Sequence, residues 1–172
     1  MQNIFFTADT HFWHENLLKF KRADGSPVRS FNTLFEMNET IIQNWNRVVK
    51  VEDRVYHLGD VTFQYDSAFT SLMHRLNGFV DLIPGNHDKL KKDGFLNHFR
   101  KVHSGWKKFK EHNFTATHFP MMLGQLRGTE YNLHGHVHEK TLSDPHYISV
   151  SVEVRNYTPV HLDEILAEIK RT

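Results

Sequence analysis

Five short apolar segments of this 172-residue chain are each followed at once by side chains that can bind a metal ion. These side chains are Asp9 with His11, Asp60, Asn86, His118, and His136 with His138. Imidazole nitrogens and carboxylate or amide oxygens are ligands for divalent cations of hard to borderline character. Their recurrence after five apolar segments favours a shared metal site over a set of unrelated turn residues.

The spacing of these residues suggests how they would hold metal. Asp9 and His11 are two residues apart, as are His136 and His138, and on an extended segment such a pair points to the same side. We therefore expect each pair to grip one cation. A short carboxylate can reach two cations ~3.5–4 Å apart, which an imidazole cannot, so we expect Asp60 to bridge two ions. Glycine at position 59 lets the backbone turn sharply into the site.

Composition narrows the chemistry further. The chain has no cysteine, which excludes a disulfide framework, a thiolate nucleophile and a thiolate metal ligand. It has 14 histidines against a formal net charge of only +1, too many for a single pH switch, and neutral imidazole is a common metal ligand. We expect His14 and His134 to be hydrogen-bond partners of the ligands. Five other histidines should face solvent, namely His98, His103, His112, His146 and His161.

The elements that must position these residues alternate between strands and helices. Apolar runs predict strands over 4–7, 54–58, 79–83, 114–117, 131–133 and 146–151. Amphipathic spacing predicts a helix beginning at the Thr33 capping box, a second ending at Gly78, and a third over 162–169. We predict one α/β domain over 1–172, with two packed mixed β-sheets flanked by helices and the metal site where the carboxyl ends of the strands meet.

Together these blocks resemble the calcineurin-like metallophosphoesterase superfamily, whose motifs run D-x-H, GD, GNH[DE], H and GHxH in that order. The chain carries them as Asp9-Thr10-His11, Gly59-Asp60, Gly85-Asn86-His87-Asp88, His118 and Gly135-His136-Val137-His138. It is also similar to a small single-domain bacterial and phage branch at residues 9–16, 29–31, 36–46 and 156–160. The resemblance implies a four-layer sandwich and hydrolysis by metal-activated water.

The resemblance also implies roles for individual residues. Asp9, His11 and His138 would bind one metal, and Asn86, His118 and His136 the other, with Asp60 shared. His87 would stabilise the transition state or protonate the departing oxygen, and Asp88 would orient the His87 ring. Two divalent ions are implied, with Mn, Fe, Zn and Ni all suited to such ligands. Arg29 is either a phosphate clamp or a structural residue.

The substrate class stays open among several alternatives. Hydrolysis of a small phosphodiester or phosphomonoester, a nucleotide among them, is favoured because the chain is too short to carry a capping domain that grips a duplex. A nuclease acting on DNA or RNA is the alternative, because residues 89–112 hold a local charge of +6 that could attract phosphates or form only a solvated face. A catalytically silent metal-binding scaffold is the third reading, and the presence of His87 beside every ligand argues against it.

The expected surroundings of the protein follow from its apolar segments. No stretch approaches the ~18 consecutive apolar residues of a membrane-spanning helix, and the first residues lack the features of a signal peptide. We therefore expect a cytoplasmic enzyme without a membrane partner, and the sequence does not decide its oligomeric state.

Overall fold

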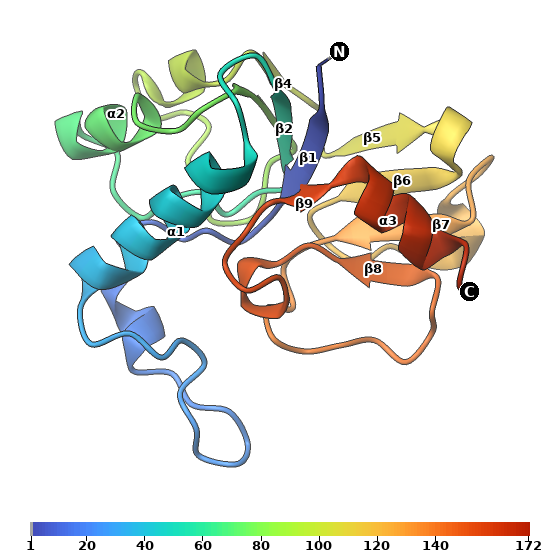
Figure 1. The fold of residues 1–172 in the computed structure, drawn as a ribbon, viewed down its shortest axis with the longest axis horizontal. Helices are drawn as coiled ribbons and strands as arrows, with labels where there is room; N and C mark the ends of the chain where they lie inside the picture. Colours follow the sequence, from blue (N-terminus) through green and yellow to red (C-terminus); the bar gives the residue numbers. More distant parts are fainter. Residues whose placement is uncertain (1) are drawn as a thin grey trace.

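The computed structural model describes residues 2–172 and contains two β-sheets (Figure 1). The first sheet has the order β4-β3-β2-β1-β9, and the second the order β5-β6-β7-β8. The first contains β1 (Ile4–Thr7), β2 (Arg54–His57), β3 (Phe79–Leu82), β4 (Lys101–Val102) and β9 (Val160–His161). The second contains β5 (Trp106–Phe109), β6 (Phe114–Thr117), β7 (Tyr131–His134) and β8 (Tyr147–Ser149). Each sheet is parallel except for one antiparallel edge strand, β9 or β5. The predicted fold class, with two mixed sheets, is confirmed.

Three α-helices lie within residues 2–172: α1 (Leu34–Val48), α2 (Ser67–Met73) and α3 (Leu162–Ile169). Short 3-10 helices are η1 (Glu15–Leu18), η2 (Phe95–His98), η3 (Lys110–His112), η4 (Leu123–Gln125) and η5 (Val152–Val154). Thr33 caps α1 as predicted, because its side chain accepts a hydrogen bond from the Glu36 main-chain N–H at 3.0 Å. In this part of the chain, no helix has the length and apolar character needed to cross a bilayer.

The second helix is shorter than predicted. It ends at Met73, not at Gly78, because α1 holds the following segment. The Asn77 main-chain N–H donates to Asn46 Oδ1 at 2.8 Å, and the Asn77 carbonyl accepts from the Trp45 indole at 2.8 Å. Gly78, with φ of 88°, instead turns the chain into β3.

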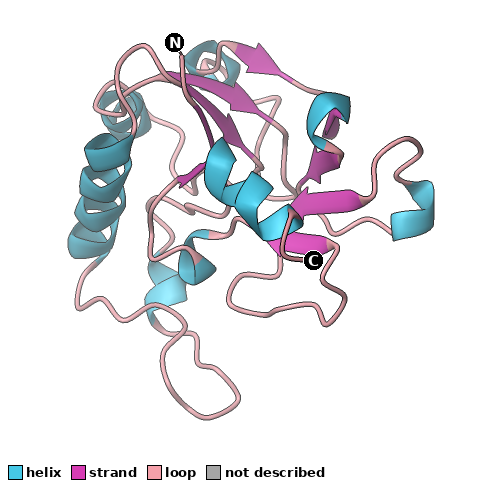
Figure 2. Ribbon diagram, turned by 45° about the vertical axis from the view of Figure 1, so that its right-hand side comes forward, coloured by secondary structure: helices cyan, strands magenta, loops and turns pink. Residues whose placement is uncertain are grey.

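Side chains along the strands of the first sheet point alternately to its two faces, and each face packs into a separate hydrophobic core. Phe5, Val55 and Val80 pack with the buried faces of α1 and α2. Their sequence neighbours Phe6 and Tyr56 point the other way and pack with apolar residues of the second sheet and α3. The view in Figure 2 shows α1 on one side of the first sheet, away from the second sheet. The first sheet is therefore covered on both faces, and its position is fixed.

The carboxyl ends of the two sets of parallel strands meet at a common rim. There the Ala8 N–H donates to the Val150 carbonyl at 3.0 Å, and the Val152 N–H donates to the Ala8 carbonyl at 3.1 Å. These bonds join the chain leaving β1 to the chain leaving β8. The loops that carry the motif residues leave the strands at this rim.

One segment stands apart from both sheets. Between η1 and α1 the chain forms a hairpin over residues 19–28, in which Lys21 and Pro27 pair as an antiparallel bridge. Both ribbon views show it projecting from the body of the molecule (Figures 1 and 2). We call it the 19–28 hairpin.

Candidate metal centre

The rim loops bring all seven predicted ligands together. Two triads form, Asp9 with His11 and His138, and Asp60 with His118 and His136; within each, the potential ligand atoms lie within 4.8 Å of one another. The amide oxygen of Asn86 is 3.0 Å from His118 Nε2, so it joins the second triad. Five separate loops thus build a single cluster of imidazole, carboxylate and amide groups.

Asp60 belongs to the second triad and also reaches the first. Its Oδ2 atom is 3.6 Å from His11 Nε2 in the first triad and 3.5 Å from His118 Nε2 in the second. Its Oδ1 atom accepts a hydrogen bond from the His87 main-chain N–H at 2.9 Å, which fixes the carboxylate in this orientation. One oxygen therefore faces a histidine of each triad, as a bridging ligand must.

Left-handed backbone conformations aim most of these side chains. Positive φ angles occur at Asp9 (58°), His11 (46°), Asp60 (58°), His136 (69°) and His138 (55°). The expectation that the paired ligands lie on extended segments is therefore wrong. The expectation that each pair grips one cation holds only for Asp9 and His11, because His136 and His138 lie in different triads. Such conformations cost of order 1–3 kcal/mol each in non-glycine residues and persist only where the surroundings enforce them. Here the His11 N–H donates to the Asp60 carbonyl at 3.0 Å.

Two glycines allow the loops to approach this closely. Gly59, with φ of 91°, lies against Gly85, and a Cβ atom on Gly59 would collide with the Gly85 backbone. A Cβ atom on Gly85 would collide with the Asp60 carboxylate. The predicted role of Gly59 in the turn is consistent with this geometry, and Gly85 is equally constrained.

Burial makes the charged forms of these groups unfavourable when no cation is present. It raises the pKa of the Asp9 carboxyl to about 7 and lowers the pKa of His118 to about 4. Both ring nitrogens of His11 are buried without a hydrogen-bond partner in the described residues. Neutral imidazoles and carboxylates with unused lone pairs are the forms that bind metal. The residues therefore fit a pair of divalent cations.

A buried ion pair supports the first triad. Glu153 Oε1 accepts from His138 Nδ1 at 2.8 Å and from Arg29 Nε at 2.9 Å, and neither the Glu153 nor the Arg29 side chain is exposed to solvent. Burial lowers the pKa of His138, but the hydrogen bond and charge of Glu153 outweigh it and raise that pKa overall. A carboxylate on one ring nitrogen fixes the orientation of a metal-binding histidine and leaves the other nitrogen free.

Sequence reasoning missed two of the residues around the first triad. Glu153 holds His138, and the Ser151 hydroxyl donates to Asp9 Oδ2 at 2.6 Å. Both lie just after β8, which ends at Ser149, two residues before the predicted end of that strand at 151. The signal used for the ligands, a polar side chain just after a strand, could therefore have identified them.

Arg29 does not act as the suggested phosphate clamp. Its side chain is fully buried, so it cannot reach a phosphate in the cavity. Besides Glu153, its guanidinium donates to the Thr10 carbonyl at 2.8 Å and to the Asp9 carbonyl. With these contacts the guanidinium braces the loop that carries Asp9 and His11, which is the structural alternative.

Asp88 also differs from its expected role. Its carboxylate accepts three main-chain N–H groups, from Asp60 at 2.9 Å, Val61 at 2.9 Å and Gly85 at 2.8 Å. The His87 ring is not among these partners. Asp88 therefore fastens the Asp60 loop to the Gly85 loop and does not orient the imidazole of His87.

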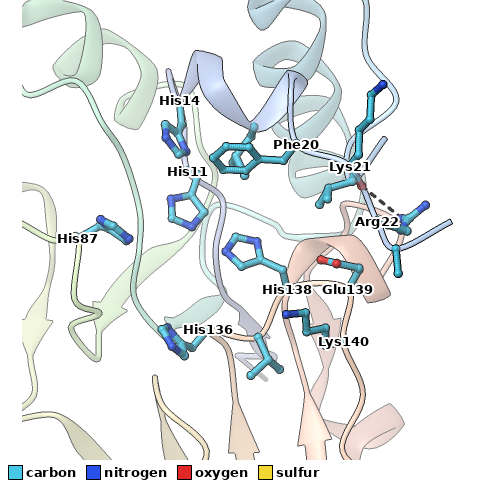
Figure 3. A pocket seen from close by; sticks show the side chains of 14 residues that line it. His11, His14, Phe20, Lys21, Arg22, His87, His136, His138, Glu139 and Lys140 are labelled. Carbon is cyan, nitrogen blue, oxygen red and sulfur yellow. Dashed lines mark hydrogen bonds between the residues drawn. The ribbon is translucent and has the colours of Figure 1, made fainter. Parts of the chain in front are cut away.

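A cavity of about 610 Å³ opens beside the two triads. Figure 3 shows His11, His87, His136 and His138 on its inner side. His87 is exposed in this cavity, and its ring centroid lies 5.1 Å from that of Phe63. His87 therefore reaches solvent at the place where a ligand of the triads would enter.

Several remaining histidines differ from expectation. The His14 ring stacks on Phe63 with centroids 3.7 Å apart, and His134 Nδ1 lies 2.9 Å from the Gly135 carbonyl. Both thus lie near the ligand loops, but these contacts are not hydrogen bonds to ligand side chains. The His103 side chain is only 8% exposed and lies 3.3 Å from Asp81, so its predicted exposure is wrong.

The cations that line the cavity are not those of the basic 89–112 segment. Lys21, Arg22 and Lys140 line it, and no residue of that segment does. Arg100 of the segment is instead paired with buried Asp81 at 2.8 Å.

Comparisons with known proteins agree over nearly the whole chain. The family model described as calcineurin-like phosphoesterase matches residues 3–171. An uncharacterized protein of Methanocaldococcus jannaschii, MJ1445, is 36% identical over 180 residues, covering 99% of this chain and 93% of its own length. The crystal structure of AQ665, a protein of unknown function from Aquifex aeolicus, matches with a TM-score of 0.77 and 26% identity, over 96% of this chain and 98% of that one.

Proposed function

Because the chain belongs to the calcineurin-like phosphoesterase family, we propose that it hydrolyses a small phosphate ester with the help of two divalent cations. The observation that supports this most strongly is the position of Asp60. Its Oδ2 atom lies 3.6 Å from a histidine of one triad and 3.5 Å from a histidine of the other. A carboxylate placed in this way can hold two ions close enough to act on the same phosphate.

In this proposal each triad binds one ion. Asp9, His11 and His138 would hold the first, His118 and His136 would hold the second together with Asn86, and Asp60 would be shared. When bound, the pair of cations supplies an activated water molecule and neutralises charge on the phosphate oxygens. Mn, Fe, Zn and Ni all suit this set of nitrogen and oxygen donors.

The residues of the chain then position the ester and move one proton. The main-chain N–H of His87 is bonded to Asp60 Oδ1 at 2.9 Å, so His87 is placed relative to the bridging carboxylate. Its exposed ring can donate a proton to the departing oxygen or a hydrogen bond to a phosphate oxygen. Glu153 and Arg29 act at a distance, by holding the His138 ring and the Asp9 loop.

The cavity supports a small substrate over a nucleic acid. Its volume of about 610 Å³ falls within the range of roughly 300–1,000 Å³ typical of small-molecule sites. The lysines at 91, 92, 107 and 108, the main reason to consider a nuclease, do not line it. The complete set of ligands with His87 supports an enzyme over a silent scaffold.

A metal-reconstituted activity screen tests this proposal. The purified protein is stripped with a chelator, reloaded with Mn²⁺, Fe²⁺, Zn²⁺ or Ni²⁺, and assayed on monoesters, diesters, cyclic nucleotides and short oligonucleotides. We expect turnover of a small ester with at least one metal, and none by Asp60→Asn, because a neutral amide is a poor bridge. Full activity without detectable metal, or a wild-type rate in Asp60→Asn, would overturn the proposal.

A further inference from the structure

The cavity beside the metal centre extends beyond the part needed to hold a phosphate. Its inner side carries histidines of the triads, and its outer side is formed by Leu17, Phe20 and Val28 together with the charged residues Lys21, Arg22, Glu139 and Lys140. Figure 3 shows Phe20 facing the side of the cavity that carries His11 and His14. A ligand larger than phosphate would therefore contact the 19–28 hairpin.

The 19–28 hairpin is ordered by bonds of its own. The Val28 N–H donates to the Phe20 carbonyl at 2.9 Å, the Arg22 N–H donates to the Ser26 carbonyl at 2.7 Å, and Arg22 Nη2 donates to the Val28 carbonyl at 3.2 Å. Most of the hairpin is nevertheless exposed to solvent. It is a preformed wall, not a segment held in place by core packing.

The base of the hairpin is fastened to the metal centre. Val28 is buried, and the next residue, Arg29, donates to the carbonyls of Thr10 and Asp9. The distance between the hairpin and the first triad is therefore set by a buried guanidinium. A group bound by the hairpin would be held at a fixed distance from the phosphate.

Aromatic rings line the side of the cavity nearest the first triad. Phe20 is 48% exposed, and its ring meets His14 edge to face with centroids 6.1 Å apart. His14 in turn stacks on Phe63, whose ring lies 5.4 Å from His11. A single exposed phenylalanine is ordinary on a protein surface. An exposed ring on the wall of a metal-centred cavity offers a flat apolar face to a bound molecule.

Positive charge complements the aromatic wall. Lys21 and Arg22 belong to the hairpin, Lys140 follows the second histidine pair, and these three cations outnumber the one carboxylate on this wall, Glu139. Figure 3 shows the Lys140 side chain reaching toward His136 and His138. A ligand with both a planar ring and an anionic group fits this combination better than an aliphatic or neutral one does.

We infer that the 19–28 hairpin binds the organic group of the phosphate ester, and that this group carries a planar ring of nucleobase size that stacks on Phe20. This inference rests on the proposed function, because the phosphate is placed at the two triads. It adds a substrate class, the phosphate esters of nucleosides or comparable aromatic groups, and a specificity residue.

Two diesters with the same leaving group test the inference. Thymidine 5′-(p-nitrophenyl) phosphate and methyl p-nitrophenyl phosphate both release p-nitrophenolate, so the ratio of their kcat/KM values reports only on the nucleoside. Stacking of one base on an aromatic ring corresponds to a loss of about 5- to 150-fold when the ring is removed. Phe20→Ala is therefore expected to lower the ratio by about 5- to 150-fold, mainly through a lower kcat/KM for the thymidine diester.

A second variant and a matched control complete the design. Because Lys21 and Pro27 face each other, residues 22–26 can be replaced by a two-residue Asn-Gly turn, which should also lower the ratio. Phe35→Ala serves as the control, because Phe35 is 66% exposed on α1 and does not line the cavity. An unchanged ratio in both hairpin variants, with activity retained, would overturn the inference and leave the proposed function standing.

A binding measurement distinguishes failure of the hairpin inference from failure of the proposed function. Calorimetry with the Mn²⁺-loaded protein compares thymidine 5′-monophosphate with methyl phosphate. We expect tighter binding of the nucleotide to the wild type and to Phe35→Ala, and loss of this preference in Phe20→Ala. If no ester of the metal-reconstituted screen is hydrolysed but this pattern appears, the proposed function fails and the hairpin site stands. Equal binding of the two phosphates by the wild type would overturn the hairpin site.

Discussion

Replacement of Glu153 by glutamine removes the negative charge of the buried support while keeping its shape. In the native protein, Glu153 Oε1 accepts from Arg29 Nε at 2.9 Å, from Arg29 Nη2 at 2.7 Å and from His138 Nδ1 at 2.8 Å. The Arg29 and Glu153 side chains are both fully shielded from solvent. Glu153→Gln therefore leaves a buried guanidinium without a compensating charge.

The expected loss of stability is large. Removal of one partner of a buried ion pair typically costs about 3–5 kcal/mol. In a chain of this length, each kcal/mol of unfolding free energy corresponds to about 2–4 °C in Tm. We therefore expect Glu153→Gln to lower the Tm of the metal-stripped protein by about 6–20 °C, measured by circular dichroism or calorimetry.

Glu168→Gln provides the matched control. Glu168 accepts from Arg155 at 2.6 Å and 2.9 Å, but the two side chains are 21% and 36% exposed. Partly exposed pairs of this kind contribute about 1 kcal/mol or less, so a small change in Tm is expected. Equal losses in the two variants would refute the argument from the buried network.

The Glu153→Gln variant should also bind metal more weakly at one of the two sites. Glu153 fixes the His138 ring, and loss of such an outer partner typically lowers metal affinity by 10- to 100-fold. Titration calorimetry with Mn²⁺ is expected to show weaker binding at the site of Asp9, His11 and His138, with little change at the other site. Unchanged affinity at both sites would mean that the hydrogen bond does not hold His138 for metal.

Three further predictions concern the reaction and its pH dependence. His87→Ala is expected to reduce kcat ~10²–10⁴-fold on alkyl phosphate esters and much less on aryl esters, because only the poor leaving group needs a proton; equal losses would indicate a phosphate-oxygen stabiliser instead. Charge reversal at Lys91, Lys92, Lys107 and Lys108 should leave steady-state turnover of small esters unchanged, since none of them lines the cavity; a large loss would contradict the site as described. Burial raises the pKa of Asp9 to about 7, so this carboxyl must lose its proton before metal binds. The apparent Mn²⁺ affinity measured by calorimetry should therefore rise with pH and level off above about 7. An affinity that does not change with pH below about 7 would contradict this prediction. Because the pKa of Asp9 is higher in the folded protein than in the unfolded chain, its contribution to the unfolding free energy of the metal-stripped protein falls as pH rises toward 7.

Much of the fold and all seven candidate ligands could be predicted because the signals are local. Apolar runs mark β1 and β6 with the observed bounds, Ile4–Thr7 and Phe114–Thr117. Parallel strands bring their carboxyl ends to one rim, so a polar residue after each run is placed near the others. Strands β4, β5 and β9 were not predicted: β4 and β9 have only two residues each, and β5 carries two lysines between its aromatic ends and so is not an apolar run.

The rest depends on contacts between distant parts of the chain. Arg29 and Glu153 are 124 residues apart, and neither residue has a neighbour in sequence that indicates the pairing. The spacing of Asp9 and His11 is compatible with an extended segment, and only the surrounding loops impose positive φ angles on both residues. Asp88 shows the same limit, since its main-chain partners lie on other loops and its neighbour His87 is not one of them.

The central claim is that this rim holds two metal ions with Asp60 between them. Anomalous diffraction from crystals of the Mn²⁺-loaded protein tests it directly, because each manganese gives its own peak. We expect two peaks ~3.5–4 Å apart, one beside Asp9, His11 and His138, the other beside Asn86, His118 and His136, with the Asp60 carboxylate touching both. A single peak, or two peaks that the Asp60 carboxylate does not join, would contradict the claim.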